Sequence, residues 1–143
     1  MSDIVEKALK YIESQFERGE PFTSPDSARR YFTLRLGIRE HEVFTVAYLD
    51  SKHRLIACEE MFRGTIDGAS VYPREIVKDA LKHNAAAVIF AHNHPSGVPE
   101  PSSADQTLTK RLKAALALLD IRVLDHIIVG GHTYTSFSER GLL

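Results

Sequence analysis

Apolar residues recur at three- and four-residue steps through the first part of the chain, the spacing of a helix with one buried face. This pattern predicts a helix over residues 2–18. Gly19 and Pro21 end it, and the Ser-Pro-Asp sequence at residues 24–26 is typical of the cap and first turn of a second helix. The second helix is predicted to end near Gly37.

The next stretch changes to a β pattern. Residues 43–49 are rich in β-branched and aromatic side chains, residues 50–53 are polar, and an extended pattern resumes from residue 54 to about 65. These features predict a β-hairpin. A further helix is predicted from about Pro73, because proline is favoured in a first helical turn, and Asn84 is expected to end it.

The second half alternates strands and helices. The wholly apolar residues 86–91 predict a central strand that is covered on both faces. Residues 94–103 hold three prolines and a glycine and predict a loop, and a helix is expected over residues 103–119. Residues 121–129 and 133–137 then predict two strands joined by a tight turn at Gly130-Gly131. Together these elements predict a three-layer α/β fold with a mixed sheet flanked by helices.

Composition narrows the class of protein. A chain of 143 residues with 43% hydrophobic and 26% charged residues is typical of one globular domain, not of a disordered or membrane-inserted chain. The longest apolar run is too short to cross a bilayer, and the N-terminus lacks the pattern of a signal peptide. The single cysteine, Cys58, cannot form an internal disulfide, so we expect a cytoplasmic location and no cysteine-rich zinc site.

The net charge of −1 gives no general attraction to nucleic acid. Four arginines do gather in a short stretch near the N-terminus: Arg29, Arg30, Arg35 and Arg39. A solvated helix face is the favoured interpretation of this cluster, and a phosphate-binding patch is the alternative.

Two histidines follow the predicted central strand. In an extended chain, side chains two residues apart point the same way, so His92 and His94 can turn both imidazoles toward one point. Asp105, in the first turn of the next predicted helix, would supply a third ligand. Two imidazoles and one carboxylate, with a position left for water, form the ligand set of a hydrolytic zinc site.

Each part of this site has an ordinary alternative. A His-x-His pair alone is weak evidence, and Ser102 with Asp105 also forms a helix capping box. A hydrolase needs a general base, and spacing does not choose among four glutamates: Glu42, Glu59, Glu60 and Glu100. For His126, a core-edge histidine bonded to its neighbour Asp125 is favoured over a role in supporting a metal ligand.

The motifs resemble a known family. Ala-His-Asn-His-Pro-Ser-Gly at residues 91–97 and Pro-Ser-Ser-Ala-Asp at residues 101–105 resemble the JAMM signature of the JAB/MPN metalloproteases. The RadC branch is the closer match, since Pro-Arg-Glu at residues 73–75 and Asp-His-Ile-Ile-Val-Gly at residues 125–130 also fit it. The resemblance covers residues 24–143 as a metal-binding domain and leaves residues 1–23 as a helical lead-in. It looks like a short, stand-alone form without the helix-hairpin-helix region of longer relatives.

The resemblance implies a cytidine-deaminase-like fold and assigns roles to the site residues. Zn²⁺ would be held by His92, His94 and Asp105, Glu42 would be the acid/base, and Ser102 would stabilise the oxyanion of a tetrahedral intermediate. The implied function is zinc-dependent hydrolysis of a peptide or isopeptide bond in an unidentified protein or peptide. The alternative is a DNA repair or recombination module, which salt-sensitive binding to duplex DNA through the arginines would support.

Overall fold

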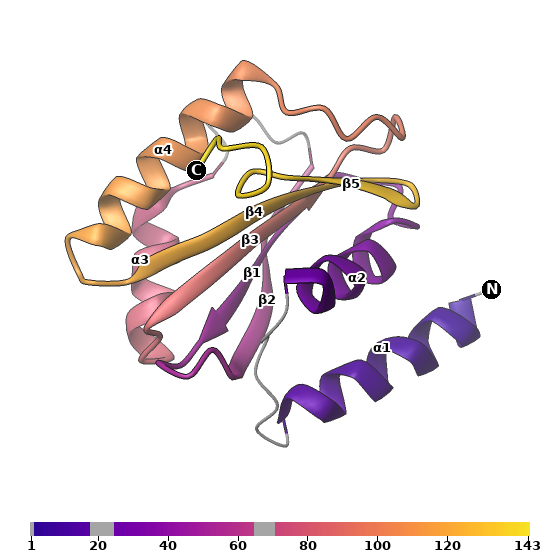
Figure 1. Ribbon diagram of the computed structural model, residues 1–143, viewed down its shortest axis with the longest axis horizontal. Coiled ribbons are helices and arrows are strands. Elements are labelled where there is room, and N and C mark those ends of the chain that lie inside the picture. The colour runs from indigo at the N-terminus through magenta and orange to yellow at the C-terminus, as the bar shows by residue number, and fades with distance from the viewer. Residues whose placement is uncertain (1, 18–24, 65–70) are drawn as a thin grey trace.

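The computed structural model describes residues 2–17, 25–64 and 71–143. Within these ranges the helices and strands follow one another along the chain as shown in Figure 1. They are α1 (Ser2–Glu17), α2 (Pro25–Leu36), β1 (Val43–Leu49), β2 (Leu55–Arg63), α3 (Pro73–Lys82), β3 (Ala87–Asn93), α4 (Ser103–Ala117), β4 (Arg122–Gly130) and β5 (Thr133–Ser136). No helix in these ranges is long and apolar enough to cross a lipid bilayer.

The strands form one mixed sheet in the order β2-β1-β3-β4-β5. Strands β3 and β4 pair in parallel, and the three other pairings are antiparallel. A parallel pair needs a long crossover connection, which α4 provides here. Because α4 begins soon after β3 ends, its first turn returns to the carboxyl end of β3.

Alternate side chains of the sheet pack into two separate cores, one on each face. On one face Val43, Ala47 and Ile89 pack with α2 and with part of α1. On the other face Phe44, Val46 and Phe90 pack with α3 and α4. The sheet therefore lies between two helical layers (Figure 1), which confirms the predicted three-layer α/β fold.

The β1–β2 hairpin is confirmed, and its turn is held by one carboxylate. Asp50 accepts hydrogen bonds from the backbone N–H groups of Lys52 and Arg54, each at 2.9 Å, and pairs with the Arg54 side chain at 2.7 Å. These bonds lower the pKa of Asp50 below its ordinary value, with the backbone bond from Arg54 as the largest cause. His53 takes the left-handed conformation that the tight turn requires, with φ of 61°.

Two predicted boundaries are wrong by one or two residues. The central strand continues through His92 and Asn93, because both residues pair with β4. The turn predicted at Gly130-Gly131 lies one residue later, since Gly130 still pairs with Thr133 in the β4–β5 ladder. Gly131 has a φ of 60°, which explains the need for glycine at that position.

Candidate metal centre

Two imidazoles and one carboxylate meet at the carboxyl end of β3. His92 Nε2 lies 3.2 Å from His94 Nε2 and 3.2 Å from Asp105 Oδ1, and His94 Nε2 lies 3.3 Å from Asp105 Oδ2. The side chains of His92 and Asp105 are only 1% and 4% exposed, whereas that of His94 is 18% exposed. The structure thus brings together the three predicted ligands in a trio that could bind a metal ion, open on the side of His94.

Local geometry fixes each ligand. His92 is part of β3 and stacks on the Phe44 ring, with ring centroids 5.9 Å apart. His94 follows the strand, and its backbone N–H donates to the carbonyl of Val129 at 2.8 Å. The Nδ1 atom of His94 lies 3.0 Å from the carbonyl oxygen of Val98. Because a carbonyl can only accept, Nδ1 donates, and Nε2 is the atom that faces Asp105.

The groups of the trio shift one another's pKa values. Burial would raise the pKa of Asp105, but its interactions with the neighbouring imidazoles of His92 and His94 outweigh burial, and the pKa lies well below its ordinary value. The pKa of His94 is raised, chiefly by its hydrogen bond to Asp105 and to a lesser extent by the charge of Glu42. Asp105 is therefore an anion throughout the range in which His94 titrates.

Glu42 comes directly before β1 and lies close enough to His94 to act on its pKa. The segment that carries Glu42 is attached to β3 by Asn93, whose side chain points to the other face of the sheet from His92. Asn93 Oδ1 accepts from the N–H of Val43 at 2.8 Å, and its Nδ2 donates to the carbonyls of His41 and Arg39 at 2.9 and 3.3 Å. The sequence interpretation missed this contact, although the alternation of β3 puts Asn93 on the face opposite to the two histidines.

The other three glutamates that the sequence offered as a base have different partners. Glu59 lies 3.1 Å from His83, Glu60 pairs with Arg39 at 2.7 Å, and Glu100 makes two bonds of 3.0 and 3.2 Å to Arg140. The charge of Glu42, by contrast, helps to raise the pKa of His94.

Ser102 and Asp105 form the capping box that the sequence suggested as an alternative. Asp105 N–H donates to Ser102 Oγ at 3.0 Å, and Ser102 N–H donates to Asp105 Oδ2 at 2.9 Å. The two interpretations of Asp105 are compatible, because the carboxylate holds the helix start through Oδ2 while both its oxygens face the imidazoles. Ser102 itself is exposed at the first turn of α4.

His126 is placed differently from the favoured prediction. Its side chain is fully buried and bonds to His92 and to Thr109, whereas Asp125 contacts only its backbone N–H, at 2.8 Å. Burial lowers its pKa well below the ordinary value, and the neighbouring His92 lowers it further. The predicted bond to Asp125 is therefore present at the backbone N–H of His126, while its ring contacts the metal-ligand candidate His92.

The loop between His94 and Ser102 lies directly on Gly130. A Cβ at that position would be 2.6 Å from the carbonyl oxygen of Gly97 and 2.8 Å from the nitrogen of Pro99. Both atoms are backbone and cannot move away without shifting the loop. Glycine at the end of β4 therefore allows the loop to pack close to the sheet, which keeps His94 beside His92 and Asp105.

The arginine cluster is largely paired with acids. Arg29 is buried and bonds to Glu139 at 3.1 Å and to Ser136 at 3.3 Å. Arg35 and Arg39 both pair with Glu60. The prediction of a solvated face is therefore wrong for Arg29, and the cluster offers fewer free charges to a phosphate backbone than the sequence suggested.

A second trio of possible metal ligands lies between β2 and α3: Glu59, Asp79 and His83. Its groups already interact, since His83 Nε2 is 3.1 Å from Glu59 and 3.8 Å from Asp79. The pKa of Glu59 is raised chiefly by a hydrogen bond with Asp79, so a proton shared between the two carboxyls can hold this trio together. The His83 ring also lies against that of Tyr48, with ring centroids 5.0 Å apart and the planes tilted by 32°.

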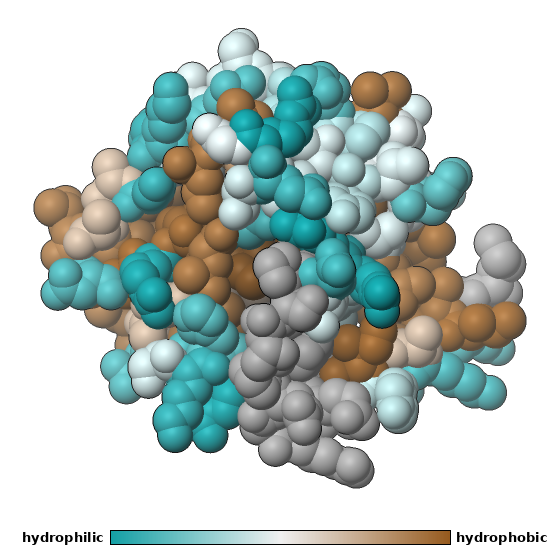
Figure 2. Space-filling view, in the orientation of Figure 1, coloured by the Kyte–Doolittle hydropathy of each residue, from teal (hydrophilic) through white to brown (hydrophobic). Residues whose placement is uncertain are grey.

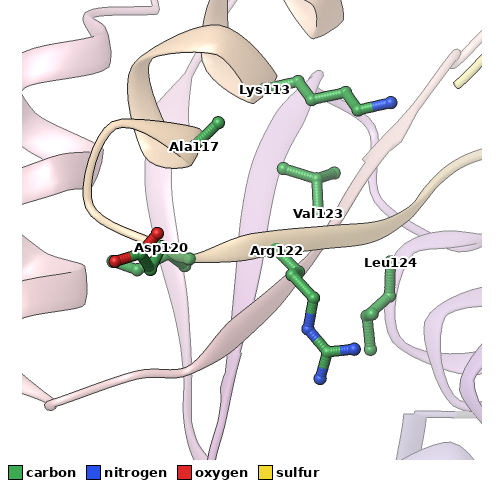
Figure 3. Close-up of a pocket in the computed structure, with 7 residues that line it drawn as sticks. Lys113, Ala117, Asp120, Arg122, Val123 and Leu124 are labelled. Carbon is green, nitrogen blue, oxygen red and sulfur yellow. The ribbon is translucent and has the colours of Figure 1, made fainter.

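A hollow of about 610 Å³ lies away from the histidines, at the connection from α4 to β4. Figure 3 shows that Arg122 and Leu124 point to one side of β4 while Val123 points to the other, toward Lys113. Its lining combines apolar side chains with three charged ones, those of Lys113, Asp120 and Arg122. The same end of α4 carries apolar surface (Figure 2), where Leu118 is 85% exposed.

Two substitutions distinguish the role of Asp105 as a metal ligand from its role in the helix cap. Asp105→Asn is expected to keep the cap, because an amide oxygen still accepts from the Ser102 N–H, but to weaken the binding of a divalent metal ion by roughly 100-fold through loss of the charged ligand. Ser102→Ala is expected to bind the metal ion like the parent and to lose about 1 kcal/mol of stability. Chelator competition and urea unfolding of the metal-free proteins measure the two effects. Equal metal affinity for Asp105→Asn and the parent would contradict the ligand assignment.

Comparison with known proteins identifies the family of this chain. The chain matches the family model of the RadC-like JAB domain over residues 22–142. It is 59% identical to a UPF0758 protein of Nitrosococcus oceani over 97% of this chain and 62% of that protein. A UPF0758 protein of Marinobacter nauticus is 57% identical with the same coverage, and one of Vibrio cholerae is 56% identical over 98% of this chain and 88% of that protein. The chain thus spans about 62% of the length of the first two relatives. It belongs to the family of RadC-like JAB domains.

Proposed function

We propose that this protein is a zinc-dependent hydrolase of the JAMM type that cleaves a peptide or isopeptide bond. The observation that carries the proposal is the trio of His92, His94 and Asp105, with the charge of Glu42 beside it. Two neutral imidazoles and one carboxylate suit zinc, and three protein ligands leave a position for water, as catalytic sites do. A zinc ion bound there would lower the pKa of a coordinated water from 15.7 to about 7 and polarise a substrate carbonyl.

Glu42 is the proposed general base and acid. Its carboxylate would take the proton of the attacking water and hand it to the leaving nitrogen, which requires a fixed position near His94. Asn93 supports that position, because it holds the backbone on both sides of Glu42 through Val43 and His41. The base is therefore attached to the same strand that carries the metal ligands.

Ser102 is proposed to stabilise the oxyanion. Its oxygen accepts from the Asp105 N–H, so its own proton is available for donation, and the side chain is exposed at the start of α4. A hydroxyl aimed at the developing negative charge stabilises the transition state more than the ground state. The substrate is proposed to be a protein or peptide of the cytoplasm, the compartment that the single cysteine suggests.

The proposal is tested on protein purified without added zinc. We expect close to one equivalent of bound zinc per chain, and cleavage of members of a proteome-derived peptide library, read as new termini by mass spectrometry. A chelator should abolish cleavage and added zinc should restore it. Less than about a tenth of an equivalent of tightly bound zinc, even after resupply, would contradict the metal site. A zinc-loaded protein that cleaves no peptide or isopeptide bond would contradict the reaction.

A further inference from the structure

A chain of hydrogen bonds leads from His92 into the core and ends on α4. His92 Nδ1 lies 2.8 Å from His126 Nε2, and His126 Nδ1 lies 2.6 Å from Thr109 Oγ1. Thr109 Oγ1 in turn lies 2.8 Å from the backbone carbonyl of Asp105. This series of hydrogen bonds therefore joins two of the three ligand candidates, His92 and Asp105, through β4 and α4, and each of its contacts is buried.

The last bond sets the direction of all the others. A carbonyl oxygen can only accept, so the single proton of the Thr109 hydroxyl is donated to Asp105. The hydroxyl must then accept from His126, which places the ring proton of His126 on Nδ1. A neutral His126 has no second proton, so its Nε2 accepts from His92 Nδ1–H. His92 is left with a lone pair on Nε2, the atom that faces His94 and Asp105.

We propose that Thr109 and His126 are positioning residues that hold His92 in the tautomer able to bind the metal through Nε2. The inference rests on the proposed function, because it assigns these residues to the same metal site. If the hydrogen bonds ran in the opposite direction, His92 would carry its proton on Nε2. That nitrogen would then have no lone pair to offer a metal ion.

The surroundings favour a fixed direction. His126 is stacked on Phe137 with ring centroids 4.7 Å apart, and Phe44 and Phe90 pack edge-on against it at 5.6 and 5.8 Å. All three phenylalanines are fully buried. An imidazole enclosed in this way cannot exchange its protein partners for water, so the partner at each nitrogen decides which nitrogen is protonated.

Thr109→Val tests this series of hydrogen bonds, because the valine side chain has nearly the shape of threonine but can neither donate nor accept a hydrogen bond. Without the hydroxyl, His126 loses the acceptor for Nδ1–H and gains by moving its proton to Nε2, which would reverse the bond to His92. We expect zinc affinity, measured by chelator competition, to fall by about 10- to 100-fold. Thr109→Ser keeps the hydroxyl and should bind zinc like the parent. Circular dichroism verifies that both variants are folded.

Nitrogen NMR of the metal-free proteins gives a second measurement that does not depend on zinc. At a pH where the imidazoles are neutral, His92 should be protonated at Nδ1 in the parent and in Thr109→Ser, and protonated in part at Nε2 in Thr109→Val. A parent with the proton of His92 on Nε2, or a Thr109→Val protein with unchanged tautomer and zinc affinity, would overturn the inference. A parent that binds no zinc but keeps the Nδ1 proton would instead contradict the proposed function.

Discussion

The double variant His92→Ala/His94→Ala is expected to lose tight zinc binding, with a fall in affinity of roughly four orders of magnitude. Zinc sites with four ligands bind with about 10–16 kcal/mol, which is roughly 3 kcal/mol for each ligand. Removal of two imidazoles therefore removes about 6 kcal/mol, and about 1.4 kcal/mol corresponds to tenfold in affinity. Chelator competition and metal analysis of the purified variant measure the loss.

His92 is buried against Phe44 and His126, so its truncation leaves a cavity as well as a missing ligand. The single variant His94→Ala avoids this, since the His94 side chain is partly exposed, and it should still lose most of the affinity. His53→Ala/His132→Ala removes two imidazoles outside the trio and serves as the matched control. A double variant with the zinc content of the parent would show that the metal is bound elsewhere.

Glu42→Gln is expected to reduce peptide cleavage by about 10²- to 10⁴-fold while the protein keeps its zinc. Glutamine has the size of glutamate but cannot take a proton from water at neutral pH. The three metal ligands are untouched, so zinc content and the unfolding midpoint should match the parent. Initial rates on a peptide that the parent cleaves, beside metal analysis of the same samples, measure both quantities.

Glu40→Gln is the control for this variant. Glu40 lies two residues earlier in the same segment and is exposed, so the same change of charge there should leave the rate near that of the parent. Cleavage by Glu42→Gln at the parental rate would remove Glu42 from the role of base. Loss of zinc in that variant would instead make Glu42 a part of the metal site.

The order and type of the elements could be predicted because their patterns are local. The helical spacing in α1, the β-branched run of β1 and the apolar run of β3 each indicate their element without reference to the rest of the chain. The boundaries that were wrong depend on pairing. His92 and Gly130 belong to strands because a neighbouring strand pairs with each of them. Neither a polar residue nor a glycine indicates such pairing from the sequence alone.

The same distinction between local pattern and long-range contact applies to the residues of the site. His92, His94 and Asp105 could be predicted because a strand end and the following helix start place them together over a short stretch of sequence. Asn93 and Thr109 could not be assigned a role, since each acts through a contact with a different element. For His126, adjacency to Asp125 suggested a bond that the backbone N–H makes, but it gave no sign of the ring's contact with His92.

The parallel pairing of β3 with β4 through α4 also has a consequence for the order of assembly. Residues 92–126 contain the ligand trio, Thr109 and His126, so one βαβ unit can enclose a metal ion as soon as its short loops close. Glu42 reaches the site only when β1 pairs with β3, across about fifty residues of chain. In a nascent chain the three proposed metal ligands can therefore come together before the proposed base reaches them. Under the proposed function, hydrolysis would then wait for the pairing of β1 with β3.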